Sequence, residues 1–186
     1  MALADFPLFG GAMTIALPQG ANDVSSVREI PDNQEVFTHP STDQSIIIEI
    51  MEYQDIEDQN APSYHFEDIS ESNNSTSSQV EVSEQIPKEQ IAMKQCKSAW
   101  FLSGKQLVAK FNEQAQNTIN IYVALYRLPE YETDILLTLN DPVSISIGSS
   151  SHVPAESYNQ NQPWTLQQFR QCVTTLKILD TSLFGE

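Results

Sequence analysis

The chain is organised around the stretch IPDNQEVF, residues 30–37. Pro31 fixes its own φ and biases the preceding residue away from helical backbone, and Asp and Asn suit the geometry of turns. An exposed turn is therefore predicted at Asp32 and Asn33. The pattern then becomes apolar, and Phe37 is expected to anchor the strand in a core. Polar side chains on a turn that a rigid sheet holds in place suit a recognition surface. The alternative is a solvated acidic turn without a partner.

The apolar run at residues 46–51 continues this pattern and predicts a strand that is covered on both faces. Residues 119–128 and 135–139 predict two paired strands around Pro129. A further hairpin is predicted around Ser103-Gly104, because these turn residues separate two apolar runs. Its strands are expected at residues 99–102 and 106–111.

Three helices are predicted, at residues 62–69, 87–96 and 166–179. The last is the clearest, because apolar side chains recur there every three or four residues and so share one face. Thr165 and Gln168 form a capping-box pattern at its start. Strand pairs with helices before and after them indicate one domain, residues 1–186, of the α+β class. Its sheet is expected to be largely antiparallel and covered by helices.

The charge is strongly negative and unevenly placed. The 186 residues carry a net charge of −16, and residues 1–87 contain 16 acidic side chains and a single basic one. Nucleic acid is an unsuitable partner because its binding requires a basic surface. A one-sided negative field would instead attract a basic protein surface, although solubility alone is the alternative explanation for the acidity.

No enzyme motif is recognisable in the sequence. A phosphate-binding loop, a dinucleotide fingerprint, a nucleophile elbow and a zinc-binding helix with two histidines are all missing. His65, Glu67 and Asp68 lie close in sequence, but their spacing spreads them around a helix and favours solvated or capping roles over a metal site. No cofactor, metal or catalytic residue is therefore expected. A cleft with a desolvated carboxylate pair would revive the enzyme alternative.

Two further features bear on the compartment. No stretch is long and apolar enough to insert into a membrane, and no basic residue precedes the apolar run near the N-terminus as a secretory signal would require. Cys96 and Cys172 are expected to be reduced and buried. A monomeric intracellular protein is the resulting expectation.

Several blocks of sequence, taken together and in order, resemble the Ran guanine nucleotide release factor family. They are residues 7–12, 31–37, 64–68, 102–106, 128–129 with 133–134, and 183–185. The likeness covers nearly the whole chain and is weakest at residues 70–79 and 142–162. The resemblance implies a Mog/PsbP-like fold, a three-layer α/β/α sandwich around a largely antiparallel sheet.

The resemblance also implies a function. Members of the family bind the small GTPase Ran, promote release of its guanine nucleotide and thereby regulate nucleocytoplasmic transport, so the protein is expected in nucleus and cytoplasm. It would be a regulator without catalytic chemistry of its own. The family's Ran-binding carboxylates fall on Asp23, Asp32 and Glu35 of this sequence. Vertebrate relatives are also linked to surface delivery of a voltage-gated sodium channel, which gives an adaptor role as the alternative.

The predicted Ran-binding residues are Asp23, Asp32, Asn33, Gln34 and Glu35. We hypothesise that Asp32 and Glu35 engage basic groups near the nucleotide site of the GTPase, while Asn33 and Gln34 fix the register. Asp23 is expected both to support them and to cap a short helical turn. Reversing the charge of Asp32 or Glu35 is then expected to abolish Ran binding while the melting curve stays almost intact.

Overall fold

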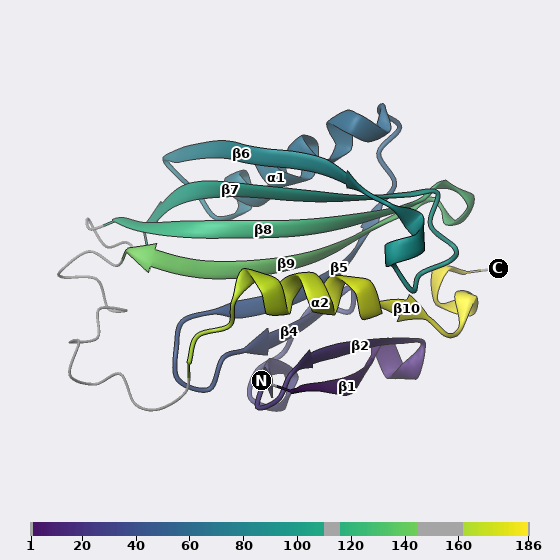
Figure 1. Ribbon diagram of the computed structural model, residues 1–186, viewed down its shortest axis with the longest axis horizontal. Coiled ribbons are helices and arrows are strands. Elements are labelled where there is room, and N and C mark those ends of the chain that lie inside the picture. The colour runs from purple at the N-terminus through teal and green to yellow at the C-terminus, as the bar shows by residue number, and fades with distance from the viewer. Residues whose placement is uncertain (1, 110–115, 145–161, 186) are drawn as a thin grey trace.

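Seven antiparallel strands form the large sheet of the protein (Figure 1). The computed structural model describes residues 2–109, 116–144 and 162–185. In spatial order the strands of the large sheet are β3 (Asn22–Asp23), β4 (Gln34–Thr38), β5 (Ser45–Glu52), β9 (Thr133–Ser144), β8 (Gln116–Leu128), β7 (Ser98–Ala109) and β6 (Ser77–Ile86).

A second, smaller sheet lies beside it. Its antiparallel strands are β1 (Leu3–Leu8), β2 (Met13–Pro18) and β10 (Lys177–Ile178), with β2 in the centre. The turn between β1 and β2 is the short 3-10 helix η1 (Phe9–Gly11), where Gly10 and Gly11 adopt positive φ. Because β10 pairs with β2, this sheet joins the two ends of the chain.

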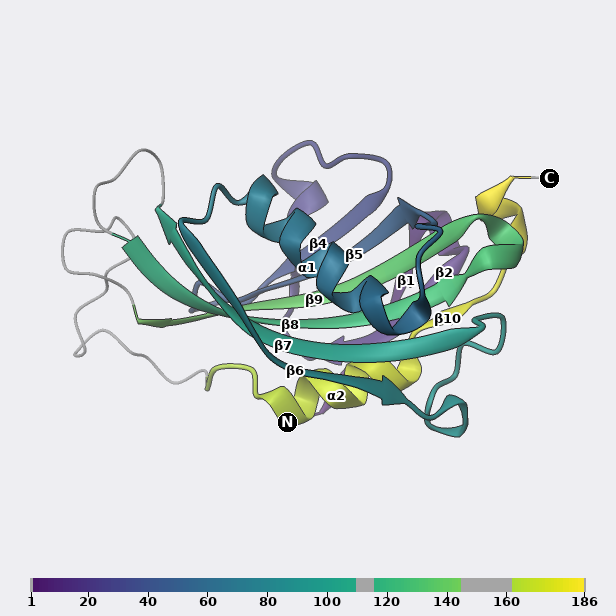
Figure 2. The ribbon, with the colours of Figure 1, turned by 90° about the horizontal axis from the view of Figure 1, so that it is seen from above.

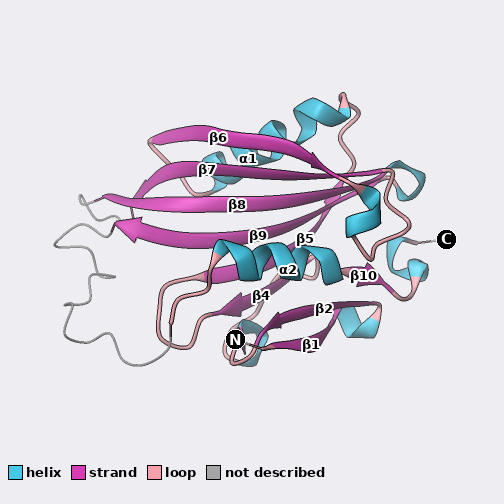
Figure 3. Ribbon diagram, in the orientation of Figure 1, coloured by secondary structure: helices cyan, strands magenta, loops and turns pink. Residues whose placement is uncertain are grey.

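Two helices cover opposite faces of the large sheet (Figure 2). Helix α1 (Ala61–Ser72) lies on one face, and α2 (Leu166–Thr175) lies on the other face together with the small sheet. Six short 3-10 helices in the described chain complete the connections (Figure 3). They are η1, η2 (Val24–Ser26), η3 (Asp58–Asn60), η4 (Lys88–Gln90), η5 (Pro129–Tyr131) and, after β10, η7 (Thr181–Phe184). The α+β class and the antiparallel sheet between helices are thus as predicted from sequence.

The large sheet separates two apolar cores. The α1 side holds a smaller cluster that includes Phe66 and Leu102, and the α2 side holds a larger one that includes Phe37 and Phe169. Strand β8 contributes side chains to both cores, because alternate side chains of a strand point to opposite faces of the sheet. Ile121, Val123 and Leu125 belong to the smaller cluster, and Ala124, Tyr126 and Leu128 to the larger.

Several predicted elements are confirmed. The apolar run at residues 46–51 lies inside β5, which pairs on both sides, and the strand pair around Pro129 is β8 with β9. The helix predicted at residues 62–69 is α1, extended at both ends. Helix α2 begins with the predicted capping box between Thr165 and Gln168. No helix among the described residues is long and apolar enough to cross a membrane.

Three expectations are wrong in detail. The hairpin predicted around Ser103-Gly104 is instead one continuous strand, β7. The helix predicted at residues 87–96 is reduced to η4, after which Ile91, Met93 and Cys96 enter the main core. The C-terminal helix ends at Thr175 rather than residue 179, because the following residues pair with β2 as β10.

Candidate functional site

The predicted turn is exposed and is held by backbone contacts. Pro31, Asp32 and Asn33 are exposed, and the amide of Gln34 donates to the carbonyl of Pro31 over 3.0 Å. Asn33 extends the pairing of β4 with β5, since its carbonyl accepts from the Ile50 amide at 2.9 Å and its Nδ2 donates to the Ile50 carbonyl at 3.1 Å. The turn is therefore fixed on the sheet, as the sequence predicts.

Asp23 acts as a cap, as expected. Its Oδ1 accepts hydrogen bonds from the amide of Ser25 at 2.9 Å and from the Ser25 hydroxyl at 2.6 Å, at the start of η2. The residue is exposed and lies in β3, opposite Phe37 of β4. Asp23 thus lies at the edge of the large sheet. It is beside the second half of β4, whereas Gln34 is the first residue of that strand.

Glu35 has a structural role that sequence reasoning did not anticipate. Its Oε1 accepts a hydrogen bond from the backbone amide of Phe9 over 2.7 Å, which ties η1 to β4. Two residues along the strand, the ring of Phe37 meets the ring of Phe6 edge to face, with centroids 5.3 Å apart. Glu35 is accordingly half-buried, on the side of β4 that packs against β1.

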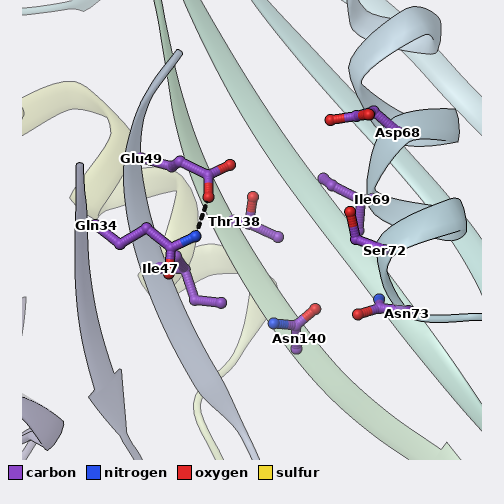
Figure 4. Close-up of a pocket in the computed structure, with 9 residues that line it drawn as sticks. All are labelled: Gln34, Ile47, Glu49, Asp68, Ile69, Ser72, Asn73, Thr138 and Asn140. Atoms are coloured by element: carbon purple, nitrogen blue, oxygen red, sulfur yellow. Dashed lines mark hydrogen bonds between the residues drawn. The ribbon is translucent and has the colours of Figure 1, made fainter. Parts of the chain in front are cut away.

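Gln34 points to the opposite face of the sheet, toward α1 (Figure 4). There it lines a groove of about 160 Å³ between β5 and α1, which we call the α1 groove. The amide of Gln34 donates to the carboxylate of Glu49 inside this groove. The other side chains that line the α1 groove are Ile47, Asp68, Ile69, Ser72, Asn73, Thr138 and Asn140.

The α1 groove is acidic. Burial raises the pKa of Glu49 and the nearby Asp68 raises it further, while the Gln34 hydrogen bond and His65 act in the opposite direction. In the described chain no ion pair joins Asp23, Asp32, Glu35 or Glu49 to a basic side chain. This edge of the sheet therefore presents carboxylates whose charges are not compensated internally.

The five predicted residues do not share one face. Gln34 faces the α1 groove, Glu35 faces β1, Asp32 and Asn33 lie in the exposed turn before them, and Asp23 caps η2 along the same edge. The structure thus gathers these residues around the first half of β4 rather than on a single flat patch. Sequence reasoning missed Glu49, although strand alternation from Ile46 would have placed it on the α1 side.

His65 belongs to a buried charged network and is neither solvated nor a cap. Its Nε2 lies 2.9 Å from Oδ2 of Asp134, whose Oδ1 accepts from Nε of Arg127 at 3.1 Å. Arg127 also donates to Asp58 and to the carbonyls of Gln54 and Ile56. This network fixes α1 and the segment before it on the sheet. Within the described ranges, no group of acidic, histidine or cysteine side chains is arranged to hold a metal ion.

Residues 6–142 match the protein family described as Ran-interacting Mog1 protein. The chain belongs to this family. A Danio rerio relative named Ran guanine nucleotide release factor is 51% identical over 183 residues, which cover 96% of this chain and 98% of the relative. The Homo sapiens protein of the same name is 44% identical, over 97% of this chain and 96% of its own length.

Less similar proteins with Mog1 names match the chain over nearly its whole length as well. A Saccharomyces cerevisiae relative named nuclear import protein MOG1 is 30% identical, over 96% of this chain and 83% of its own length. The crystal structure of the Saccharomyces cerevisiae Ran-binding protein Mog1p superimposes with a TM-score of 0.71 and 26% identity, with both chains covered completely. The Mog1 fold implied by the sequence resemblance is therefore confirmed.

Proposed function

We propose that this Mog1 family protein, as one domain, binds the small GTPase Ran and promotes release of its guanine nucleotide. The names of the relatives support this function, and so does the set of carboxylates without internal ion pairs around β4. The relative named as a nuclear import protein supports a part in nucleocytoplasmic transport. Nucleus and cytoplasm are the proposed compartments, as the sequence resemblance implies. The protein acts as a monomeric regulator and has no catalytic chemistry of its own.

The binding surface proposed is the turn at Asp32 and Asn33 together with the free side of Glu35. Asp32 is exposed, and one oxygen of Glu35 has no hydrogen bond to the described residues. Both can accept charge-assisted hydrogen bonds from basic groups of Ran. Asn33 and Gln34 fix the register of the turn through their bonds to β5, and Asp23 extends the negative edge.

Nucleotide release follows from differential binding. Ran holds its nucleotide through basic and Mg²⁺ contacts to the phosphates, as small GTPases do. A factor that prefers the nucleotide-poor form weakens nucleotide binding, and the nucleotide weakens binding of the factor to the same extent. Each tenfold acceleration requires about 1.4 kcal/mol of barrier lowering. One or two charge-assisted contacts, at roughly 1.5–3 kcal/mol each, would supply it.

The deciding experiment is timed release of a labelled guanine nucleotide from Ran, with and without this protein. The matched pair of variants is Asp32→Lys and Asp43→Lys, because both aspartates are exposed and Asp43 lies in the turn at the other end of β4. We expect wild type and Asp43→Lys to accelerate release and Asp32→Lys to lose the effect. Unchanged acceleration by Asp32→Lys would remove the proposed surface, and no acceleration by wild type would remove the function.

The channel adaptor role stays a prediction from the resemblance. None of the relatives named above carries a channel in its name, and no observation in the described structure favours such a partner.

A further inference from the structure

The segment from β6 to β7 and the turn from β8 to β9 lie at the same end of the large sheet (Figure 1). Residues of these two segments line a second pocket. Its volume is about 430 Å³, and three lysines line it: Lys88, Lys94 and Lys97. We call it the lysine pocket. Cys96, Glu130 and Tyr131 also contribute to its wall.

The charge of this pocket is opposite to that of the protein. The chain has nine basic residues against 25 acidic ones, yet three of the nine converge here. Lys97 is partly compensated, since its Nζ lies 3.3 Å from Oδ2 of Asp58. Neither Lys88 nor Lys94 forms an ion pair with the acidic side chains that the structure describes. Because the wall holds three lysines and one carboxylate, that of Glu130, the lysine pocket is a local positive site.

Lys88 and Lys94 share the wall of the pocket with Cys96. Burial raises the pKa of the Cys96 thiol, and the charges of both Lys88 and Lys94 oppose this rise. The Cys96 thiol itself is buried and donates to the carbonyl of Met93 over 3.2 Å. Lys88 and Lys94 thus line the same pocket although they lie six positions apart in the sequence. Nζ of Lys94 also donates to the carbonyl of Ile91 over 2.9 Å.

The backbone that carries the lysines is anchored. The Ala92 amide donates to the Thr174 carbonyl over 3.0 Å, and the Lys97 amide donates to the Arg127 carbonyl over 2.7 Å. Between them, Met93 and Cys96 are buried in the main core. A bound ligand would therefore order the lysine side chains, while the backbone of residues 92–97 is already held in place. This lowers the entropic cost of association.

We propose that the lysine pocket binds a phosphate monoester or free phosphate. Lysine supplies a compact point charge with several donors, and a phosphoryl dianion matches a group of ammonium charges around one pocket better than a single carboxylate does. The net charge of −16 repels extended polyanions, so the ligand must carry its charge on one compact group. The volume leaves room for the group to which the phosphate is attached.

The test is a titration of the full chain with inorganic phosphate and, separately, with O-phosphoserine, followed by amide chemical shifts. We expect shifts confined to residues 88–97 and 129–132. The double variant Lys88→Gln/Lys94→Gln should weaken binding at least about tenfold, as expected when two charged contacts are lost. The control is Lys105→Gln, because Lys105 is an exposed lysine of β7 that already pairs with Glu81 at 3.0 Å. It should bind as wild type does.

The two ligands distinguish the source of the phosphate. Tighter binding of O-phosphoserine indicates a phosphorylated protein segment, and equal binding indicates the free anion. Shifts spread evenly over all lysines, or unchanged binding by the double variant, would overturn the proposal. If the double variant melts early, Lys88→Gln alone decides the question. Lys94 donates to the carbonyl of Ile91 over 2.9 Å, whereas Lys88 forms no ion pair with the described residues.

Discussion

The backbone amide of Phe9 donates to the carboxylate of Glu35 across 2.7 Å and so joins the turn of the small sheet to an edge of the large one. This carboxylate has two oxygens, and only one of them accepts a hydrogen bond from the residues that the structure describes. Glu35 can therefore hold η1 in place and still offer an acceptor to a partner. The structural and binding roles of this residue must be separated by experiment.

We expect Glu35→Lys and Glu35→Ala to lower stability as well as Ran binding. Each leaves the part-buried Phe9 amide without its acceptor, at a cost of about 1–3 kcal/mol. This differs from the expectation from sequence, which was that Glu35→Lys leaves the melting curve almost intact. Glu35→Gln is the matched control, because it keeps an oxygen acceptor and removes only the charge. Thermal melting measures the first effect, and Ran affinity measures the second. Equal melting of Glu35→Ala and wild type would show that the hydrogen bond is unimportant.

Association with Ran should slow as salt is added. The net charge of −16 steers a basic partner toward the protein, and salt screens such steering over a Debye length of about 8 Å at physiological ionic strength. Stopped-flow association rates at several salt concentrations measure the effect, with dissociation rates followed in parallel. If the association rate is insensitive to salt, the uneven charge serves solubility alone.

Glu49→Gln should stabilise the protein at neutral pH. Burial raises the pKa of Glu49 above its ordinary value of 4.5, so the folded state binds its proton more tightly than the unfolded state does. The ionised carboxylate therefore costs stability above its folded pKa, and this cost disappears as the pH falls below 4.5. Solvent screening limits the gain to under about 1 kcal/mol.

Melting temperatures of wild type and Glu49→Gln should accordingly converge in acid. Glu52→Gln is the control, because it makes the same substitution at an exposed position of the same strand. A Glu49→Gln variant that is less stable than wild type at neutral pH would mean that its bond with Gln34 outweighs the cost of burial.

Loss of the Arg127 guanidinium should be severely destabilising. Arg127 is completely buried, donates to Asp134, Asp58 and two backbone carbonyls, and lies over the ring of Tyr53 at 4.3 Å. Arg127→Met removes the guanidinium that pairs with the buried Asp134 and leaves its Oδ1 without that donor, at a cost of about 3–5 kcal/mol. Chemical denaturation measures the loss.

The control for Arg127 is Arg170→Met. Arg170 pairs with Glu84 at 3.0 Å, but both side chains are about half exposed, and such surface pairs contribute at most about 1 kcal/mol. Similar losses in the two variants would show that the buried network contributes no more than a surface pair.

Gly104→Ala should destabilise the contact between α1 and β7. A methyl group at this position would lie 2.6 Å from the ring of Phe66 and 2.6 Å from the carbonyl oxygen of Gln79. Overpacking of this kind costs about 1–3 kcal/mol. Phe66→Leu removes the ring, so a double-mutant cycle should show partial rescue. Strictly additive losses would contradict the close approach.

Gly104 also shows where sequence reasoning failed. Ser103-Gly104 has the composition of a turn, and the hairpin prediction followed from local chemistry alone. The glycine is instead required in mid-strand because Phe66 of α1 packs directly on the backbone. The contact joins residues 38 positions apart, and only the tertiary structure reveals it. The misplaced helix at residues 87–96 has a similar origin, since burial of Met93 and Cys96 overrides the local preference.

The site was predictable to the extent that it depends on local pattern. The exposed turn at Asp32 and the cap at Asp23 follow from proline and Asx chemistry, which acts within a few residues. The bond between Glu35 and Phe9 and the network of His65, Asp134 and Arg127 join distant segments. A single sequence carries no signal for such pairings. The family resemblance supplied the order of blocks but not these contacts.

The two-sided burial of β8 has a consequence for hydrogen exchange. Because its alternate side chains anchor separate cores, its amides become accessible to deuterium only when both cores open together. Protection should therefore be greatest in β8 and β9 and decline toward β3 and β6 at the margins of the sheet. The backbone amides at the edge that carries Asp32 and Glu35 would then be among the first to exchange. A partner that binds at this edge would be detected because it slows the exchange of these amides.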